Sequence, residues 1–399
     1  MSRRVVVIGG GASGTAAAYA AHQAGAAVVV VTGRPGASSL GSGALDGPTL
    51  AALGAARGAV LSFIEALGAW EITDDACQLA TSAGLLRESR GRDKSVLDVA
   101  RFKNAVVAVV DASRPTWDAV GLARAWSGEP WATARGVRFE PVAVDVLRHA
   151  HESMAPDADL AALHDDAGRV DWLLERLRKA PALEGKCAVL LGPWLGTRPG
   201  LGTQLSAGLG KPVGEPLSLP GGVAGLRFDA ARDDMLARIG ATRVAGWAVR
   251  LTSGGATPAA VLAELESGET IDADAAVLAV GGLTAGGIRF APPQPFELSL
   301  ACPAVLALRG TPLLTSGSPH GASFEAFAWS GYRSAAGFER VGIWVDENGG
   351  FRAADGSPRA ALFAAGDTVA DAPRKLLDAV RSGLVAGGSA ALEDGQEGA

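Results

Sequence analysis

A glycine-rich turn near the N-terminus constrains the fold of this chain more than any other feature. Residues 5–8 form a β-branched run suited to a strand buried on both faces of a parallel sheet. The run leads directly into Gly-Gly-Gly-Ala-Ser-Gly, in which Gly9, Gly11 and Gly14 occupy the positions of a G-x-G-x-x-G motif. An alanine-rich helical stretch and a second strand at 27–31 follow. This order of strand, turn, helix and strand is the context in which the motif binds a dinucleotide.

Each position of the motif has a physical role in holding a pyrophosphate. Gly9 permits the tight turn, Gly11 lets the backbone approach the ligand, and Gly14 allows helix and strand to pack closely. The free N–H groups at the start of the helix, at Ala12 and Ser13, would bind the anion with the help of the helix dipole.

The residue after the second strand departs from the usual pattern. An Asp or Glu commonly stands there and binds the adenosine ribose. This chain has Thr32 instead, which offers a single hydroxyl. The pyrophosphate motif predicts FAD, whereas FMN, which has no adenosine to bind, stays open as the alternative.

The loop at 34–47 is rich in small and hydroxyl residues. We expect Ser38, Ser39 and Ser42 to hydrogen-bond a flavin cofactor and Gly43 to let the backbone approach its ring. The alternative is a flexible linker.

Two glycine motifs in the C-terminal half complete the predicted cofactor site. An apolar strand beginning at residue 275 ends in Gly281 and Gly282, and a second strand, at 360–365, ends in Gly366 and Asp367 before a C-terminal helix. Asp367 is predicted to contact the ribityl or pyrophosphate part of the cofactor. Gly281 and Gly282 also fit a buried strand that ends in a glycine turn without a ligand, and Asp367 could instead be a helix-capping or turn residue.

The fold predicted from these motifs is α/β: a two-dinucleotide-binding-type flavoprotein fold with a Rossmann-like parallel sheet and a β-meander. We expect the flavin-binding domain in three parts, at 1–86, 205–288 and 335–399. An inserted α+β cap domain at 87–204 and a cap segment at 289–334 would interrupt it.

Charge and cysteine content exclude several classes of function. A net charge of −6 with no basic stripe argues against nucleic acid as a partner. Cys77, Cys187 and Cys302 lie far apart, so they form neither an iron–sulfur motif nor a disulfide framework, and we expect buried thiols. With no credible secretory signal or membrane span, a cytoplasmic protein is expected.

Four of the five histidines lie in surroundings that bear on a functional role. We expect His149, His151 and His164, which lie among acidic residues, to be exposed to solvent, and we predict no metal site. His320, in a glycine-serine loop, is a candidate proton donor near a flavin or, alternatively, a turn cap.

The stretch at 29–46, VVVTGRPGASSLGSGALD, resembles the corresponding part of the B subunit of anaerobic glycerol-3-phosphate dehydrogenase. That family also tends to have Thr after the second strand, followed by a small-residue loop. The resemblance covers most of the chain and is most specific at 5–46, 217–251, 277–282 and 342–383.

This resemblance implies a flavin-containing subunit that takes part in oxidising glycerol 3-phosphate to dihydroxyacetone phosphate. Its partners in the same complex would be a catalytic FAD subunit, which oxidises the substrate, and an iron–sulfur subunit, which passes electrons to quinone. Association with the inner face of the membrane would then be peripheral, through these partners. Two other interpretations stay open: a degenerate flavoprotein-fold scaffold without redox turnover, and a free-standing flavin dehydrogenase of the fumarate-reductase type.

Overall fold

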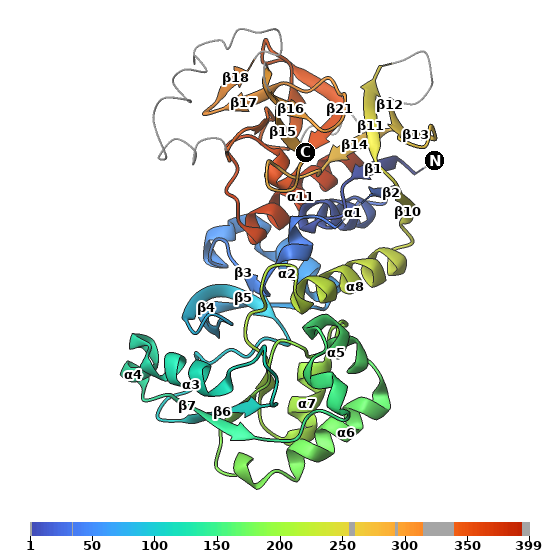
Figure 1. Cartoon of the computed structure of the whole chain (residues 1–399). Helices are drawn as coiled ribbons and strands as arrows, with labels where there is room; N and C mark the ends of the chain where they lie inside the picture. Colours follow the sequence, from blue (N-terminus) through green and yellow to red (C-terminus); the bar gives the residue numbers. More distant parts are fainter. Residues whose placement is uncertain (1, 34, 255–259, 292–293, 314–338, 393–399) are drawn as a thin grey trace. The chain divides into compact units, whose positions relative to one another are not determined.

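The computed structural model describes residues 2–33, 35–254, 260–291, 294–313 and 339–392 (Figure 1). The chain divides into two compact units, the first made of 1–38, 58–63 and 233–399 and the second of 39–57 and 64–232. The N-terminal and C-terminal segments therefore belong to the same unit. The finer five-part division expected from the sequence stays a prediction.

The first unit contains a six-stranded sheet in the order β10-β2-β1-β14-β21-β20. All neighbours pair in parallel except β20 and β21. The bounds are β1 Arg4–Ile8, β2 Ala27–Thr32, β10 Thr242–Ala245, β14 Ala275–Leu278, β20 Gly350–Arg352 and β21 Pro358–Ala364. Since β1 lies between β2 and β14, the sheet reverses its direction of winding there, and ligands of such sheets bind at the carboxyl ends of the strands at this point.

Helices α1, Ala12–Gln23, and α11, Leu376–Ala391, pack against each other in this unit. The close approach depends on two glycines of α11. A Cβ on Gly383 would lie 2.1 Å from the carbonyl oxygen of Ser13, and one on Gly387 would lie 2.1 Å from that of Ala17. Larger residues at these positions would force the helices apart.

Smaller sheets complete the first unit. The meander predicted from the sequence is present as β11, Ala248–Ser253, β12, Val261–Leu265, and β13, Thr270–Ala273. A two-stranded sheet joins β15, Ile288–Ala291, to β16, Gln294–Leu298, and a three-stranded one joins β17, Leu306–Leu308, to β18, Thr311–Leu313, and β19, Gly342–Ile343.

The sequence run at 242–251 has strand propensity throughout and predicts one strand, but this prediction is wrong. The run forms two strands in different sheets, because the chain leaves the parallel sheet at Gly246, whose φ is +155°. Asn348 and Gly349 predict the turn of a hairpin, and the structure confirms it: Gly349 donates to the carbonyl of Asp346, and Val345 and Phe351 form an antiparallel bridge across the turn. Strand β19, just before this hairpin, pairs with β17.

The second unit contains two sheets and most of the remaining helices. An antiparallel sheet joins β3, Ala44–Leu45, β5, Leu86–Asp93, and β4, Trp70–Ala80. A parallel sheet runs in the order β7, Arg138–Ala143, β6, Val106–Asp111, β8, Ala188–Leu190, and β9, Val213–Gly214. Its helices are α3 Ala119–Gly128, α4 Pro130–Arg135, α5 Asp157–Leu163, α6 Ala167–Arg178 and α7 Leu201–Leu209. Helices α2, Arg57–Leu67, and α8, Val223–Arg238, contribute residues to both units.

The three cysteines differ in burial. Cys77 is buried as expected, whereas Cys187 and Cys302 are half-buried, and all three are free thiols. Over the described ranges, no cluster of His, Cys, Asp and Glu suits a metal ion. None of the helices described here has the length and hydropathy needed to cross a membrane.

Candidate functional site: the glycine turn and the C-terminal Gly-Asp motif

Two glycines of the N-terminal motif are required by the fold itself. A Cβ on Gly9, whose φ is +118°, would lie 2.2 Å from the carbonyl oxygen of Ala279, just after β14. A Cβ on Gly14 would lie 1.9 Å from the carbonyl oxygen of Gly9. The turn between β1 and α1 can form only if both positions lack a side chain.

Gly11 differs, because no residue in the described part of the chain demands a glycine there. Its φ of −75° is open to any residue, and the nearest atom to a Cβ would be the Ser38 Oγ at 3.5 Å. The space beside Gly11 is therefore left open at the start of α1, where N–H groups and the helix dipole favour an anion. A pyrophosphate fits this arrangement, and the glycine is then explained by backbone approach to that ligand.

Ser38 and Thr32 lie beside this turn. The Ser38 hydroxyl accepts a hydrogen bond of 2.9 Å from the N–H of Ala12, the first residue of α1. Thr32, at the end of β2, lies against Gly10, whose Cβ would be 3.0 Å from the Thr32 Oγ1. Both hydroxyls thus flank the pyrophosphate turn within the first unit.

The C-terminal glycine motifs meet the N-terminal turn at the same sheet edge. A Cβ on Gly366 would lie 2.4 Å from the Ser13 Oγ, and one on Gly282 would lie 2.8 Å from the carbonyl oxygen of Asp367. The buried Thr368 hydroxyl accepts a hydrogen bond of 2.9 Å from the N–H of Gly281. Motifs separated by about 350 residues in sequence are therefore brought together by the parallel sheet.

Asp367 is partly buried, and its electrostatic surroundings are unusual for a loop carboxylate. Burial raises the pKa of Asp367, and the opposing effect comes from Arg374, whose Nη1 lies 3.8 Å from Oδ1. The same Nη1 donates to the carbonyl oxygens of Asp367 and Val369. Helix α11 is preceded by Lys375 as its N-cap, without a side-chain capping bond, so Asp367 does not cap that helix.

A cavity of about 390 Å³ adjoins the C-terminal motif. Gly366 and Ser382 line it, and Ser382 accepts a hydrogen bond of 3.0 Å from the N–H of Gly366. Asp346, Asp378 and Arg381 bring charged groups to its wall. Burial raises the pKa of Asp378. The cavity is mixed in character, since valines and a proline line it as well.

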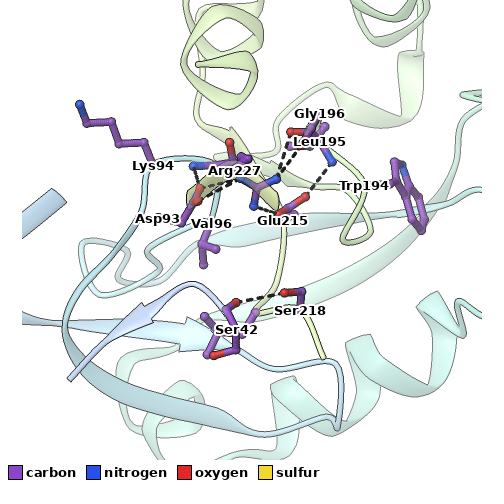
Figure 2. A network of polar contacts seen from close by, with 12 residues as sticks. Ser42, Asp93, Lys94, Val96, Trp194, Leu195, Gly196, Glu215, Ser218 and Arg227 are labelled. Carbon is purple, nitrogen blue, oxygen red and sulfur yellow. Dashed lines mark hydrogen bonds and ion pairs between the residues drawn. The ribbon is translucent and has the colours of Figure 1, made fainter. Parts of the chain in front are cut away.

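The other expected loop residues, Ser39, Ser42 and Gly43, belong to the second unit. The Ser39 hydroxyl donates to Asp229 over 2.8 Å. The carbonyl of Ser42 accepts a bond of 3.0 Å from the N–H of Ser218 (Figure 2). These polar groups therefore have partners within their own unit.

A buried charge network adjoins this loop and was not foreseen from the sequence (Figure 2). Arg227 on α8 is fully buried and forms ion pairs with Asp93, over 3.0 Å, and with Glu215. The N–H of Asp93 donates over 2.7 Å to the carbonyl of Gly43, which links the network to the loop. Glu215 also accepts a bond of 2.8 Å from the N–H of Leu195.

One arginine faces two buried carboxylates in this network, which leaves a net negative charge if both are ionised. Burial is the main cause that raises the pKa of Glu215 to about 7, while Arg227 opposes the shift and the nearby Asp93 adds to it. The carboxylates in turn raise the pKa of Arg227 against the effect of its burial. The network therefore holds a proton near neutral pH.

The expectation that His164 is exposed was wrong. It is 1% exposed, its Nδ1 lies 3.0 Å from the carbonyl oxygen of Trp194, and burial lowers its pKa. His149 and His151 are exposed as expected, and their rings stack at 5.6 Å. Exposure was expected because Asp165 and Asp166 follow His164 in the sequence. All three residues come after the last residue of α5, Leu163.

Two buried arginines of the second unit contact Glu152. Arg114 donates to Glu152 and Ala155 carbonyls and pairs with Asp157 over 2.8 Å. Arg169 pairs with the buried carboxylate of Glu152 over 2.5 Å. His320, the candidate proton donor, lies outside the described residues.

Comparison with known proteins supports the assignment of the cofactor. Residues 4–84 match a family model described as an FAD binding domain. The class of protein that the fold and the turn define is thus a flavoprotein with FAD as its cofactor, and flavin-dependent oxidoreductase is the class of activity that the match indicates. No curated protein matches the chain.

Solved structures similar to this chain include two 3-ketosteroid dehydrogenases and a fumarate reductase. The 3-ketosteroid Δ1-dehydrogenase of Sterolibacterium denitrificans is 13% identical, with a TM-score of 0.41 over 98% of this chain and 100% of that one. A flavocytochrome c3 fumarate reductase is 12% identical, with a TM-score of 0.45 over 98% and 78%. The 3-ketosteroid-Δ4-(5α)-dehydrogenase of Rhodococcus jostii RHA1 is 14% identical, with a TM-score of 0.36 over 98% and 97%. Likeness at this level leaves the substrate of this chain open.

Proposed function

We propose that this chain is the FAD-binding subunit of a flavin-dependent dehydrogenase complex that resembles anaerobic glycerol-3-phosphate dehydrogenase. The observation that carries the proposal is the open space beside Gly11, at the start of α1 and next to the Ser38 hydroxyl. A scaffold that had lost its cofactor would have no need to keep this position free of a side chain.

The residues of the chain would act on the cofactor by binding and orienting it. The Ala12 N–H donates to the Ser38 hydroxyl, so the other N–H groups in the first turn of α1, that of Ser13 among them, would hold the pyrophosphate. The Asp367 carboxylate would accept a hydrogen bond from a cofactor hydroxyl. Bound FAD would supply hydride and electron transfer at its flavin ring. Two further steps belong to the same proposal: substrate oxidation by a catalytic FAD partner, and electron transfer to quinone through an iron–sulfur partner.

A free-standing dehydrogenase is the less favoured alternative. It would need cationic and acid–base groups available to a substrate anion. The buried Arg114 and Arg169 already pair with Asp157 and Glu152, and the Nδ1 of His164 contacts a backbone carbonyl. These contacts hold the three side chains within the second unit.

Two measurements test the proposal. Acid release of the cofactor followed by chromatography should identify FAD, while a purified chain without the visible absorbance of oxidised flavin would favour the scaffold. The flavin-loaded chain alone should oxidise glycerol 3-phosphate poorly with a soluble dye, and co-expressed partner subunits should co-purify with it and restore turnover. Rapid turnover by the single chain would overturn its assignment to a complex.

A further inference from the structure

The end of β2 lacks the usual carboxylate, but an aromatic side chain lies beside it. A Cβ on Gly33, the residue after β2, would lie 2.8 Å from the Nε1 and 2.9 Å from the Cδ1 of Trp247. It would also lie 2.7 Å from the carbonyl oxygen of Gly246. The indole therefore packs directly against the chain where β2 ends, and only glycine leaves room for it.

Backbone pairing fixes Trp247 at this edge of the sheet. Strand β10 pairs in parallel with β2 so that Ala245 lies opposite Thr32, and the Gly246 N–H donates to the Thr32 carbonyl over 3.3 Å. The Trp247 carbonyl accepts a bond of 2.8 Å from the N–H of Glu266 in the meander. Trp247 is nevertheless 36% exposed, so part of this large side chain faces solvent at the carboxyl edge.

The residues along this edge form a series that leads outward from the pyrophosphate turn. Gly11 leaves its space open, Gly10 lies against the Thr32 hydroxyl, and Gly33 lies against the indole of Trp247. In dinucleotide-binding sheets the residue at the end of the second strand contacts the adenosine ribose. The base attached to that ribose must therefore lie near the next groups in the series.

We propose that Trp247 binds the adenine of FAD by stacking, and that Trp247 and Thr32 together replace the absent carboxylate. This inference rests on FAD as the cofactor and names the residue that would make the chain prefer FAD over FMN. An indole offers a rigid apolar face to a base, and such stacking is worth about 1–3 kcal/mol per base, or roughly 5–150-fold in affinity.

The test compares Trp247→Ala and Trp247→Phe with the wild type, using flavin-free protein of the full chain. Val249→Ala is the matched control, because Val249 lies two residues further on and is 39% exposed. FAD, FMN and ADP are titrated separately, since ADP carries the adenosine without the flavin. The melting temperature of each apoprotein is measured to detect loss of folding.

Trp247→Ala should weaken binding of FAD and ADP by roughly 5–150-fold and leave FMN affinity unchanged. Trp247→Phe should retain most of the affinity, and Val249→Ala should retain all of it. Equal losses for FAD and FMN, or unchanged affinity for FAD and ADP, would overturn the role of Trp247. A wild-type apoprotein that binds neither flavin would overturn the proposed function as well, so the two failures are distinguishable.

Discussion

Because the pKa of Glu215 is raised in the folded protein, the free energy of unfolding should fall as the pH rises toward neutrality and this residue loses its proton. In the folded chain, burial beside Asp93 raises the pKa of Glu215 from 4.5 to about 7 even though Arg227 is present. The folded protein thus retains a proton that the unfolded chain releases. This contribution to stability is complete below pH 4.5 and is lost as the pH rises through about 7.

The size of the effect follows from the two pKa values. Each pKa unit corresponds to about 1.4 kcal/mol, so the interval from 4.5 to about 7 is worth roughly 3 kcal/mol of unfolding free energy. Glu215→Gln imitates the protonated side chain and should remove this dependence. In the wild type, one carboxylate oxygen of Glu215 accepts a hydrogen bond from Arg227 and the other accepts one from the N–H of Leu195. Glutamine keeps only one acceptor oxygen, so the variant should also lose about 1–3 kcal/mol of unfolding free energy at every pH.

The assay is denaturant unfolding of the wild type and Glu215→Gln at a series of pH values from 4.5 to about 8. For each protein, the change in unfolding free energy with pH is measured, and the change for Glu215→Gln is subtracted from the change for the wild type. The subtraction removes the contribution of the other titrating groups, which the two proteins share. Glu175→Gln is the control, since Glu175 is exposed and pairs with Lys179 at the surface. Parallel pH profiles for the wild type and Glu215→Gln would refute the reasoning.

Three further variants test the network and the cofactor site. Arg227→Met should destabilise the protein by about 3–5 kcal/mol in chemical unfolding, because two buried carboxylates lose their cation, and an unchanged stability would contradict that role. Gly11→Val should abolish FAD binding in a titration while the apoprotein melts as the wild type does, since the chain itself leaves room for a side chain there. Asp367→Ala should weaken FAD binding by roughly 10–150-fold. Its apoprotein should melt normally, whereas unchanged affinity with a lowered melting temperature would remove Asp367 from the site.

The parts of the fold predicted from the sequence are those with a strong local pattern. The strand, glycine turn and helix at the N-terminus follow from a β-branched run and a short motif, and β1 begins one residue before the expected run at 5–8. The C-terminal strand and helix were likewise placed to within a few residues. Here local propensity and burial favour the same structure.

The failures share a different cause. The run at 242–251 has strand propensity throughout, but only tertiary pairing decides that residues up to Ala245 join β2 and that the rest join the meander. Arg227 and Asp93 are 134 residues apart, and nothing local marks either as buried. The sequence does carry a signal in α11, where glycines at 383 and 387, one helical turn apart, indicate close contact with another helix.

The glycines of the cofactor site can be divided by what each one is needed for. At Gly9, Gly14 and Gly366 a Cβ would collide with atoms of the chain itself, so these residues are explained by folding alone. Among the described residues Gly11 has no such neighbour, and a bound pyrophosphate explains why this position is a glycine. A glycine motif therefore indicates a ligand most clearly at the position where the folded protein would tolerate a side chain.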